Sequence, residues 1–120
     1  MKRNMKQWIQ EMIAADVKTP MPVLSFPAVQ LMGVSVRELI SDAGLQAEGM
    51  RRVTERVRSA AAVSLMDLSV EAECFGAQVR VSDDEVPTVV GCTVDDAEAA
   101  EALQIPEVGT GRTGLYVEAI

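Results

Sequence analysis

A nearly unbroken apolar run from Ala60 to Leu68 constrains the fold more than any other feature of the chain. Its sequence, Ala-Ala-Ala-Val-Ser-Leu-Met-Asp-Leu, shows no alternation of polar and apolar residues. A run of this kind is typical of a β-strand covered on both faces, as in parallel sheets flanked by helices. A second run, Pro22–Phe26, is framed by prolines, which favour a short buried strand over a buried helix.

Helix signals surround these two predicted strands. Residues 5–13 carry apolar side chains at the spacing of an amphipathic helix, and residues 45–58 form a second helical stretch with Leu45, Met50, Val53 and Val57 on one side. Ser35 and Glu38 form a capping-box pattern at the start of another helix. Acidic residues at 95–98 open a further helix that we expect to run to about Gln104.

The order of the elements indicates a fold class. Residues 78–81 and 86–90 read as a β-hairpin around the turn 82–85. With the helices and buried strands before it, the pattern predicts the opening of a parallel α/β fold. The helix expected from Thr113 stops at Ile120, an apolar residue, without a cap or glycine. We therefore interpret residues 1–120 as a single partial domain, the front part of a larger parallel α/β fold.

Composition and charge exclude several classes of protein. The net charge of −7 argues against nucleic-acid binding, which needs a surplus of Lys and Arg. The arginines at 51–58 are interspersed with two valines and with the acids Glu48 and Glu55, a pattern that predicts a solvated helix face. The sequence shows neither a signal peptide nor an apolar segment of membrane-spanning length. The two cysteines fit no disulfide framework, so we expect a reducing, cytoplasmic location with no membrane partner.

The chain lacks the residues of several common active sites. It contains no His, which rules out Ser-His and Cys-His nucleophiles within it. Cys74 and Cys92 alone cannot supply the four ligands of a structural zinc site. Gly109–Gly114 matches the dinucleotide pattern G-x-G-x-x-G, but no strand precedes it, which favours a loop that caps a helix. We predict no catalytic residue, metal ligand or resident cofactor in this chain.

Asp67 is the most informative polar residue. It ends the long apolar run, the position at which barrel strands present functional side chains. Its carboxylate either contacts a ligand there or caps the turn or helix expected over residues 69–75, and the residues themselves support both roles equally. Glu71 and Glu73 lie two apart, so on a helix they face different sides, and one of them is expected to be internal.

Residues 66–76, Met-Asp-Leu-Ser-Val-Glu-Ala-Glu-Cys-Phe-Gly, resemble the uroporphyrinogen decarboxylase superfamily. Within it, the resemblance is to the cobalamin-dependent methyltransferase branch of the methylcobamide:coenzyme M type. Further support comes from the leading helix, the first strand, residues 33–38, and Gly111-Arg112 before the last helix. The resemblance implies an incomplete (β/α)8 TIM barrel. This chain would supply its N-terminal helix, its first two strands with their helices, and the hairpin.

The resemblance also implies a site. Asp67 falls where the decarboxylases place an Asp that binds the pyrrole nitrogens of a tetrapyrrole, and a carboxylate can accept several N–H bonds. In the methyltransferase branch the barrel mouth accepts a methyl-corrinoid, and zinc activates the acceptor thiol. The zinc ligands of that branch lie in a later part of the barrel. The decarboxylases carry an Arg-rich stretch after the first strand, whereas Phe26–Gly33 contains no cation, which argues against decarboxylation.

Three functions remain under consideration. The first is the N-terminal portion of a methyltransferase that moves a methyl group from a corrinoid to a thiol or similar acceptor and is inactive alone. The partner of such a parent protein would be a corrinoid protein or a tetrapyrrole-type small molecule. The alternatives are a fragment of a uroporphyrinogen decarboxylase and a free-standing, non-enzymatic α/β interaction module. An authentic stop codon after Ile120 would favour the module.

We expect the isolated chain to form homo-oligomers, because two buried parallel strands leave open sheet edges and an unmatched apolar face. Sedimentation velocity at rising protein concentration measures this association directly. Ideal monomer behaviour at high concentration would contradict the partial-barrel interpretation.

Overall fold

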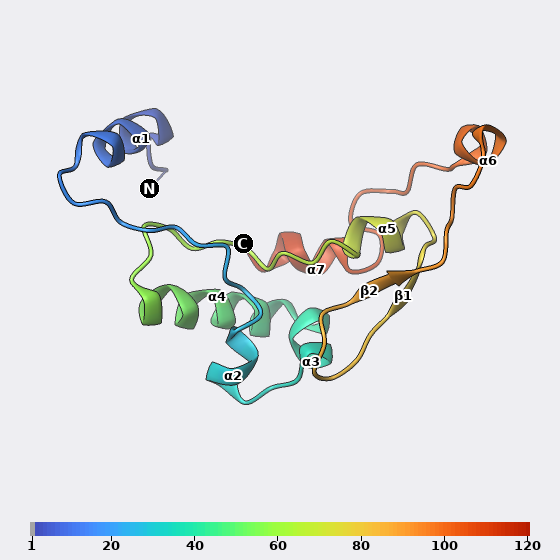
Figure 1. The fold of residues 1–120 in the computed structure, drawn as a ribbon, viewed down its shortest axis with the longest axis horizontal. Helices are drawn as coiled ribbons and strands as arrows, with labels where there is room; N and C mark the ends of the chain where they lie inside the picture. The colour runs from blue at the N-terminus through green and yellow to red at the C-terminus, as the bar shows by residue number, and fades with distance from the viewer. Residues whose placement is uncertain (1) are drawn as a thin grey trace.

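The computed structural model describes residues 2–120 as short helices and one small antiparallel sheet (Figure 1). Several expected elements are present, including the first helix, the helix after Asp42, the hairpin and the acid-capped helix. In chain order the elements are α1 (Met5–Ala14), α2 (Ala28–Met32), α3 (Val36–Ser41), α4 (Ala43–Val57), α5 (Val70–Cys74), β1 (Gln78–Arg80), β2 (Thr88–Val90), α6 (Ala97–Ala102) and α7 (Thr113–Glu118).

Side-chain caps fix where the helices begin. The capping box at α3 is confirmed: the Glu38 amide donates to Ser35 Oγ at 3.1 Å, and the Ser35 amide donates to Glu38 Oε2 at 2.7 Å. Asp96 accepts the Ala99 amide at 2.7 Å at the start of α6. The sequence pattern did not predict α2, because a helix of five residues is too short to show a helical repeat.

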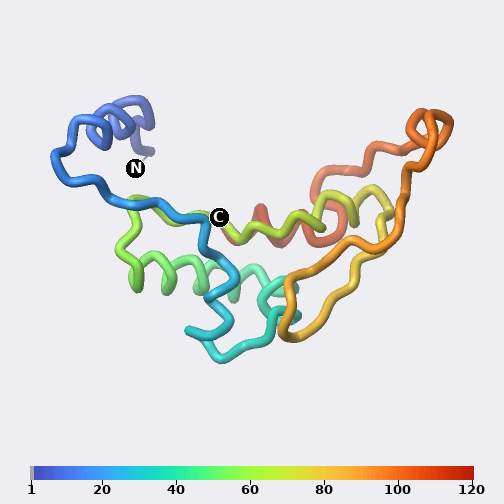
Figure 2. The backbone as a smooth tube through the Cα atoms, viewed as in Figure 1, coloured from blue at the N-terminus to red at the C-terminus, as the bar shows by residue number. Residues whose placement is uncertain are grey.

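The two apolar runs are extended but form no strands, which corrects the sequence prediction. They lie side by side and run in the same direction (Figure 2): the Ala60 amide donates to the Pro20 carbonyl at 2.8 Å, and the Met66 amide to Ser25 Oγ at 3.1 Å. Among the described residues, the single sheet is the hairpin β1–β2, with Val79 opposite Val89. A parallel ladder needs regularly repeated backbone hydrogen bonds, and these two contacts do not supply them.

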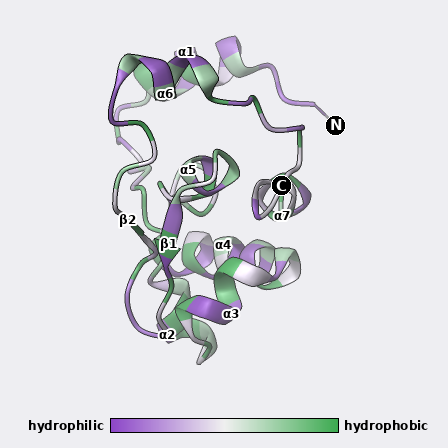
Figure 3. Cartoon of the chain, turned by 90° about the vertical axis from the view of Figure 1, so that its right-hand side faces the viewer, coloured by the Kyte–Doolittle hydropathy of each residue, from purple (hydrophilic) through white to green (hydrophobic). Residues whose placement is uncertain are grey.

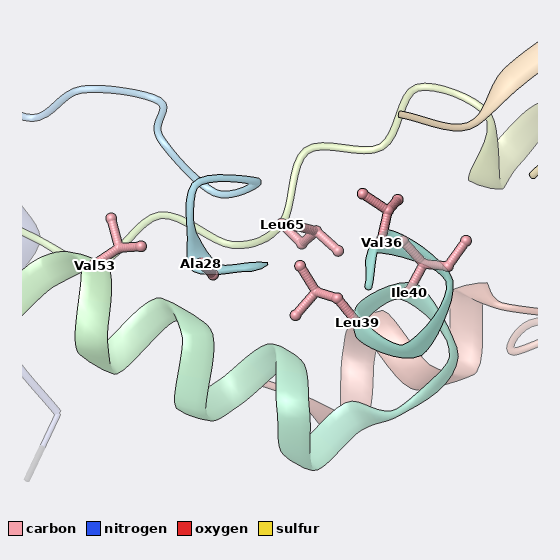
Figure 4. Close-up of a cluster of buried hydrophobic side chains, with 6 residues drawn as sticks. All are labelled: Ala28, Val36, Leu39, Ile40, Val53 and Leu65. Atoms are coloured by element: carbon pink, nitrogen blue, oxygen red, sulfur yellow. The ribbon is translucent and has the colours of Figure 1, made fainter. Parts of the chain in front are cut away.

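The hydrophobic core covers one face of this extended pair. Helices α2, α3 and α4 pack beneath it, and α4 approaches α2 very closely at Gly49. A Cβ atom at Gly49 would lie 2.8 Å from the Cβ of Ala28, so the contact excludes any larger residue. The core cluster, drawn in Figure 4, consists of Ala28, Val36, Leu39, Ile40, Val53 and Leu65.

The opposite face of the extended pair is uncovered, so within these residues the pair is covered on one face only, and the other is the unmatched apolar face expected from the sequence. Met21, Val23 and Met66 are exposed there, and Leu68 is 83% exposed. The accessible surface of the chain is 8604 Å², whereas a compact protein of 12.9 kDa exposes about 6300 Å². The radius of gyration is 17.4 Å, against about 14 Å for a compact domain of this length. The chain is therefore open and elongated.

None of the helices in the part of the chain that the structure describes combines the length and the apolar character needed to cross a membrane.

A leucine-to-alanine substitution should lower the stability of the fold much more in the core than on the uncovered face of the extended pair. Leu39 is 1% exposed, so Leu39→Ala should lower the free energy of unfolding by about 2–5 kcal/mol through the cavity it leaves. Leu68→Ala serves as the matched control and should change it by less than about 0.5 kcal/mol. Urea denaturation followed by circular dichroism measures both. Equal losses would mean that the Leu68 face is covered in solution.

Candidate functional site

Asp67 lies at the end of the second extended segment, where the chain turns into α5. Its side chain has no exposed surface. Oδ1 accepts the Ser69 amide at 2.9 Å and the Ser69 hydroxyl at 2.6 Å. These bonds form an Asx turn over residues 67–69, so Asp67 holds the turn that leads into α5. The N-cap of α5 itself is Ser69, which makes no side-chain cap bond.

Arg112 brings the C-terminal helix to Asp67. Its Nη1 donates to Asp67 Oδ2, Nη2 donates to Ser69 Oγ at 2.9 Å, and Nε donates to Glu73 Oε2 at 2.6 Å. Tyr116, one turn into α7, donates its hydroxyl to Asp67 Oδ2 at 3.0 Å. We refer to these five residues as the Asp67 network. All of the hydrogen-bonding positions of its central carboxylate are occupied by donors from the same chain.

The glycine-rich stretch before α7 is a turn that places Arg112 within hydrogen-bonding distance of Asp67. Gly109 and Gly111 adopt positive φ angles of 86° and 58°, a region that L side chains rarely occupy. A Cβ atom at Gly114 would lie 3.0 Å from the Gly109 carbonyl oxygen, so this position must also remain small. The prediction of a loop that leads into a helix is confirmed, and the glycines have a structural reason that needs no nucleotide.

The network keeps both Asp67 and Arg112 in their charged forms. Burial raises the pKa of Asp67, but hydrogen bonds from Ser69, Arg112 and Tyr116 outweigh burial and hold that pKa below its ordinary value. Burial likewise lowers the pKa of Arg112, and its bonds to Asp67 and Glu73 more than offset that effect. Burial and the nearby Asp67 charge both raise the pKa of the Tyr116 phenol, so it remains a hydrogen-bond donor at neutral pH.

Two pockets open beside the network, on the uncovered face. One, of about 350 Å³, is lined by Asp67, Leu68, Glu71, Tyr116 and other residues of the same two segments. The other, of about 300 Å³, is lined by residues 23–27 together with Met66 and Leu68. Neither lining contains a Lys or Arg. The described residues offer no cluster of three or more His, Cys, Asp or Glu side chains able to hold a metal ion.

The sequence predicted part of this site. One of the two glutamates was expected to be internal, and Glu73 is the one that meets Arg112, while Glu71 is exposed. Arg112 and Tyr116 were not predicted as members of the site, because their partner lies more than 40 residues earlier in the chain. One signal was available: Arg112 is the sole Lys or Arg after Arg80. A single cation in an acidic half of a chain is a candidate for a buried ion pair.

Comparison with known proteins gives one positive finding. The sequence model of the family described as Uroporphyrinogen decarboxylase (URO-D) matches residues 20–120. This range contains the extended pair, the helices packed beneath it and the whole Asp67 network. No curated protein and no solved structure gave a match to the chain.

The stability of the chain should depend on the charge of Asp67. Because its pKa is lowered by folding, the ion pair stabilises the fold fully above about pH 4, the ordinary range of Asp, and loses this effect as the pH falls further. Asp67→Asn should cost about 1–3 kcal/mol at pH 7. It should also flatten the loss of stability below pH 4, measured by urea denaturation at each pH.

The matched control is Asp16→Asn, at an exposed residue of the linker after α1, which should keep the wild-type pH profile. A wild-type slope in Asp67→Asn would show that the acid sensitivity has another origin.

Proposed function

Because the chain belongs to the uroporphyrinogen decarboxylase family, we propose that it forms the N-terminal portion of a (β/α)8-barrel methyltransferase of this family. The proposed reaction moves a methyl group from a corrinoid to a thiol or similar acceptor. The corrinoid is a substrate here, presented free or on a corrinoid protein. The 120-residue chain alone would be inactive, because it supplies part of the barrel mouth and no complete set of catalytic groups.

The arrangement of the extended pair supports a barrel. Neighbouring strands of a (β/α)8 barrel are parallel, with helices outside and side chains packed inside. Residues 20–26 and 60–68 run in parallel, α2 and α4 cover one of their faces, and the opposite face carries exposed apolar side chains. In the proposed barrel this uncovered face points inward. Asp67 then lies at the carboxyl end of the second strand, where barrel enzymes bind their ligands.

The lack of a Lys or Arg in the linings of the two pockets beside Asp67 is the observation that carries the choice of a corrinoid. A porphyrinogen bears several carboxylates, and proteins hold carboxylates with Arg or Lys. Residues 26–33 contain neither residue type. Arg112, the one cation of the Asp67 network, is already paired with Asp67 and Glu73. The pocket beside it carries the exposed carboxylate of Glu71, which would repel a polycarboxylate.

In this proposal Asp67 contacts the bound corrinoid or tetrapyrrole at the barrel mouth. Its oxygens are occupied in the present arrangement, so a ligand N–H must replace one of the donors on Oδ2, Tyr116 or Arg112. Zinc does not fit this chain, since it has no His and the described residues contain no suitable ligand cluster. We therefore assign no step to zinc, and activation of the thiol would fall to residues outside these 120.

A porphyrinogen decarboxylase is the second candidate, and Asp67 is the observation in its favour. A buried carboxylate at the carboxyl end of a barrel strand is suited to accepting several pyrrole N–H bonds at once. The two candidates differ in what must hold the rest of the ligand, namely cations for a polycarboxylate and apolar surface for a corrinoid.

A binding comparison on the full 120-residue chain tests the choice. We expect methylcobalamin to bind more tightly than the polycarboxylate uroporphyrin in equilibrium dialysis, because the uncovered face is apolar and lacks a free cation. Leu68→Glu should weaken methylcobalamin binding at least about tenfold, since a charge there must be desolvated. Val86→Glu, in the exposed hairpin loop, is the control and should leave binding unchanged. Tighter binding of uroporphyrin would favour the decarboxylase instead.

A further inference from the structure

Asp67 borders the pocket of about 350 Å³, yet its side chain has no exposed surface. Tyr116, half-buried on α7, lines the same pocket and donates its hydroxyl to Asp67 Oδ2 at 3.0 Å. Helix α7 lies beside α5 and above α4 in Figure 1 and in the perpendicular view of Figure 3. A ligand in this pocket therefore reaches Asp67 Oδ2 only after one of the donors on that oxygen has moved.

Tyr116 is the donor whose movement costs less. Arg112 donates to Asp67, Ser69 and Glu73 together, so its withdrawal breaks three hydrogen bonds, two of them to carboxylates. The Tyr116 hydroxyl makes one hydrogen bond, and a change of side-chain rotamer breaks it while α7 stays in place. Tyr116 also borders the pocket, whereas Arg112 is not part of its lining. An entering ligand group therefore displaces Tyr116 and leaves the ion pair intact.

A primary carboxamide satisfies both groups that this movement separates. Its N–H donates to Asp67 Oδ2, and its carbonyl oxygen accepts the Tyr116 hydroxyl, so two hydrogen bonds replace one. A ketone or an ester accepts from Tyr116 but leaves Oδ2 without its lost donor. A carboxylate has the same defect, since it too only accepts, and it is also repelled by the exposed Glu71 in the same pocket. Glu71 is in turn available to accept the second N–H of the carboxamide.

We propose that Asp67 and Tyr116 form a carboxamide clamp, in which a primary carboxamide of the ligand enters between Asp67 Oδ2 and the Tyr116 hydroxyl. The identity of that ligand rests on the proposed function: a corrinoid carries carboxamide side chains around its ring, whereas a porphyrinogen carries carboxylates. The pocket is near the lower end of the range of about 300–1000 Å³ found for ligand pockets. It therefore takes a side chain of the corrinoid, and the macrocycle lies on the uncovered apolar face.

Three small compounds of nearly the same shape test the clamp in the full 120-residue chain: propionamide, propionate and butanone. Tyr116 is the single tyrosine, so a chain labelled with 3-fluorotyrosine gives one ¹⁹F NMR signal that reports on it. Propionamide should shift this signal with a Kd at least about tenfold below those of propionate and butanone, because it alone donates to the charged oxygen of Asp67. Equal Kd values, or no shift with propionamide, would overturn the proposal.

Two variants assign the preference to particular side chains. Asp67→Asn should remove the preference for propionamide over butanone, since an Asn side chain also donates to a ketone oxygen. Glu71→Gln should lower the preference for propionamide over propionate several-fold. Its matched control is Glu118→Gln, the same charge change at an exposed position of α7 outside the pocket lining, which should keep that preference within about twofold. An unchanged preference in a folded Asp67→Asn, or equal effects of the two Glu variants, would overturn the clamp.

Methylcobalamin separates this inference from the proposed function. If one of its carboxamides occupies the clamp, methylcobalamin should shift the Tyr116 signal and raise the apparent Kd of propionamide by competition. Methylcobalamin that binds in equilibrium dialysis without competing with propionamide would overturn the clamp as its binding site and leave the proposed methyl transfer standing. Selective binding of propionamide by a chain that does not bind methylcobalamin would support the clamp and contradict the proposed function.

Discussion

The ion pair between Arg112 and Asp67 joins parts of the chain that lie far apart in the sequence. Asp67 ends an extended segment, Glu73 lies on α5, and Arg112 and Tyr116 belong to the last helix and the turn before it. A charge this deeply buried is costly unless hydrogen bonds replace the lost water. Here each oxygen of Asp67 accepts two bonds, and every buried side-chain polar atom among the described residues has a partner. The C-terminal helix is therefore positioned by these polar contacts together with the packing of Tyr116 against the hydrophobic core.

In the remainder of the fold, the helices pack against only one face of the extended pair. Helices α2, α3 and α4 bury a small aliphatic core against the extended pair, and the close approach at Gly49 sets how near α4 comes to α2. The other side of the pair keeps its apolar residues exposed. The Asp67 network lies at the end of this uncovered side, so the same asymmetry that leaves the fold open also produces the two pockets beside Asp67.

Local signals in the sequence were predictive, and long-range ones were not. The helical repeat of α1, the capping box at Ser35 and the hairpin depend on residues within a few positions of one another, and all are confirmed. The two strands were predicted from apolar character alone, but a strand requires partners that periodicity cannot identify. Arg112 was not predicted as a site residue for the same reason, because its partner Asp67 lies far away in the sequence. The resemblance at residues 66–76 indicated the superfamily that the family match confirms, while the methyltransferase branch stays a proposal.

The contact between Gly49 and Ala28 has a consequence for how this sequence can vary. With 2.8 Å between Ala28 Cβ and the place where a Cβ atom of residue 49 would lie, residue 49 cannot gain a side chain while residue 28 keeps its Cβ and the two helices keep their separation. The two sites are on different helices, 21 positions apart. Because glycine is already the smallest residue, a side chain at position 49 requires either Gly at position 28 or a wider separation of α2 and α4.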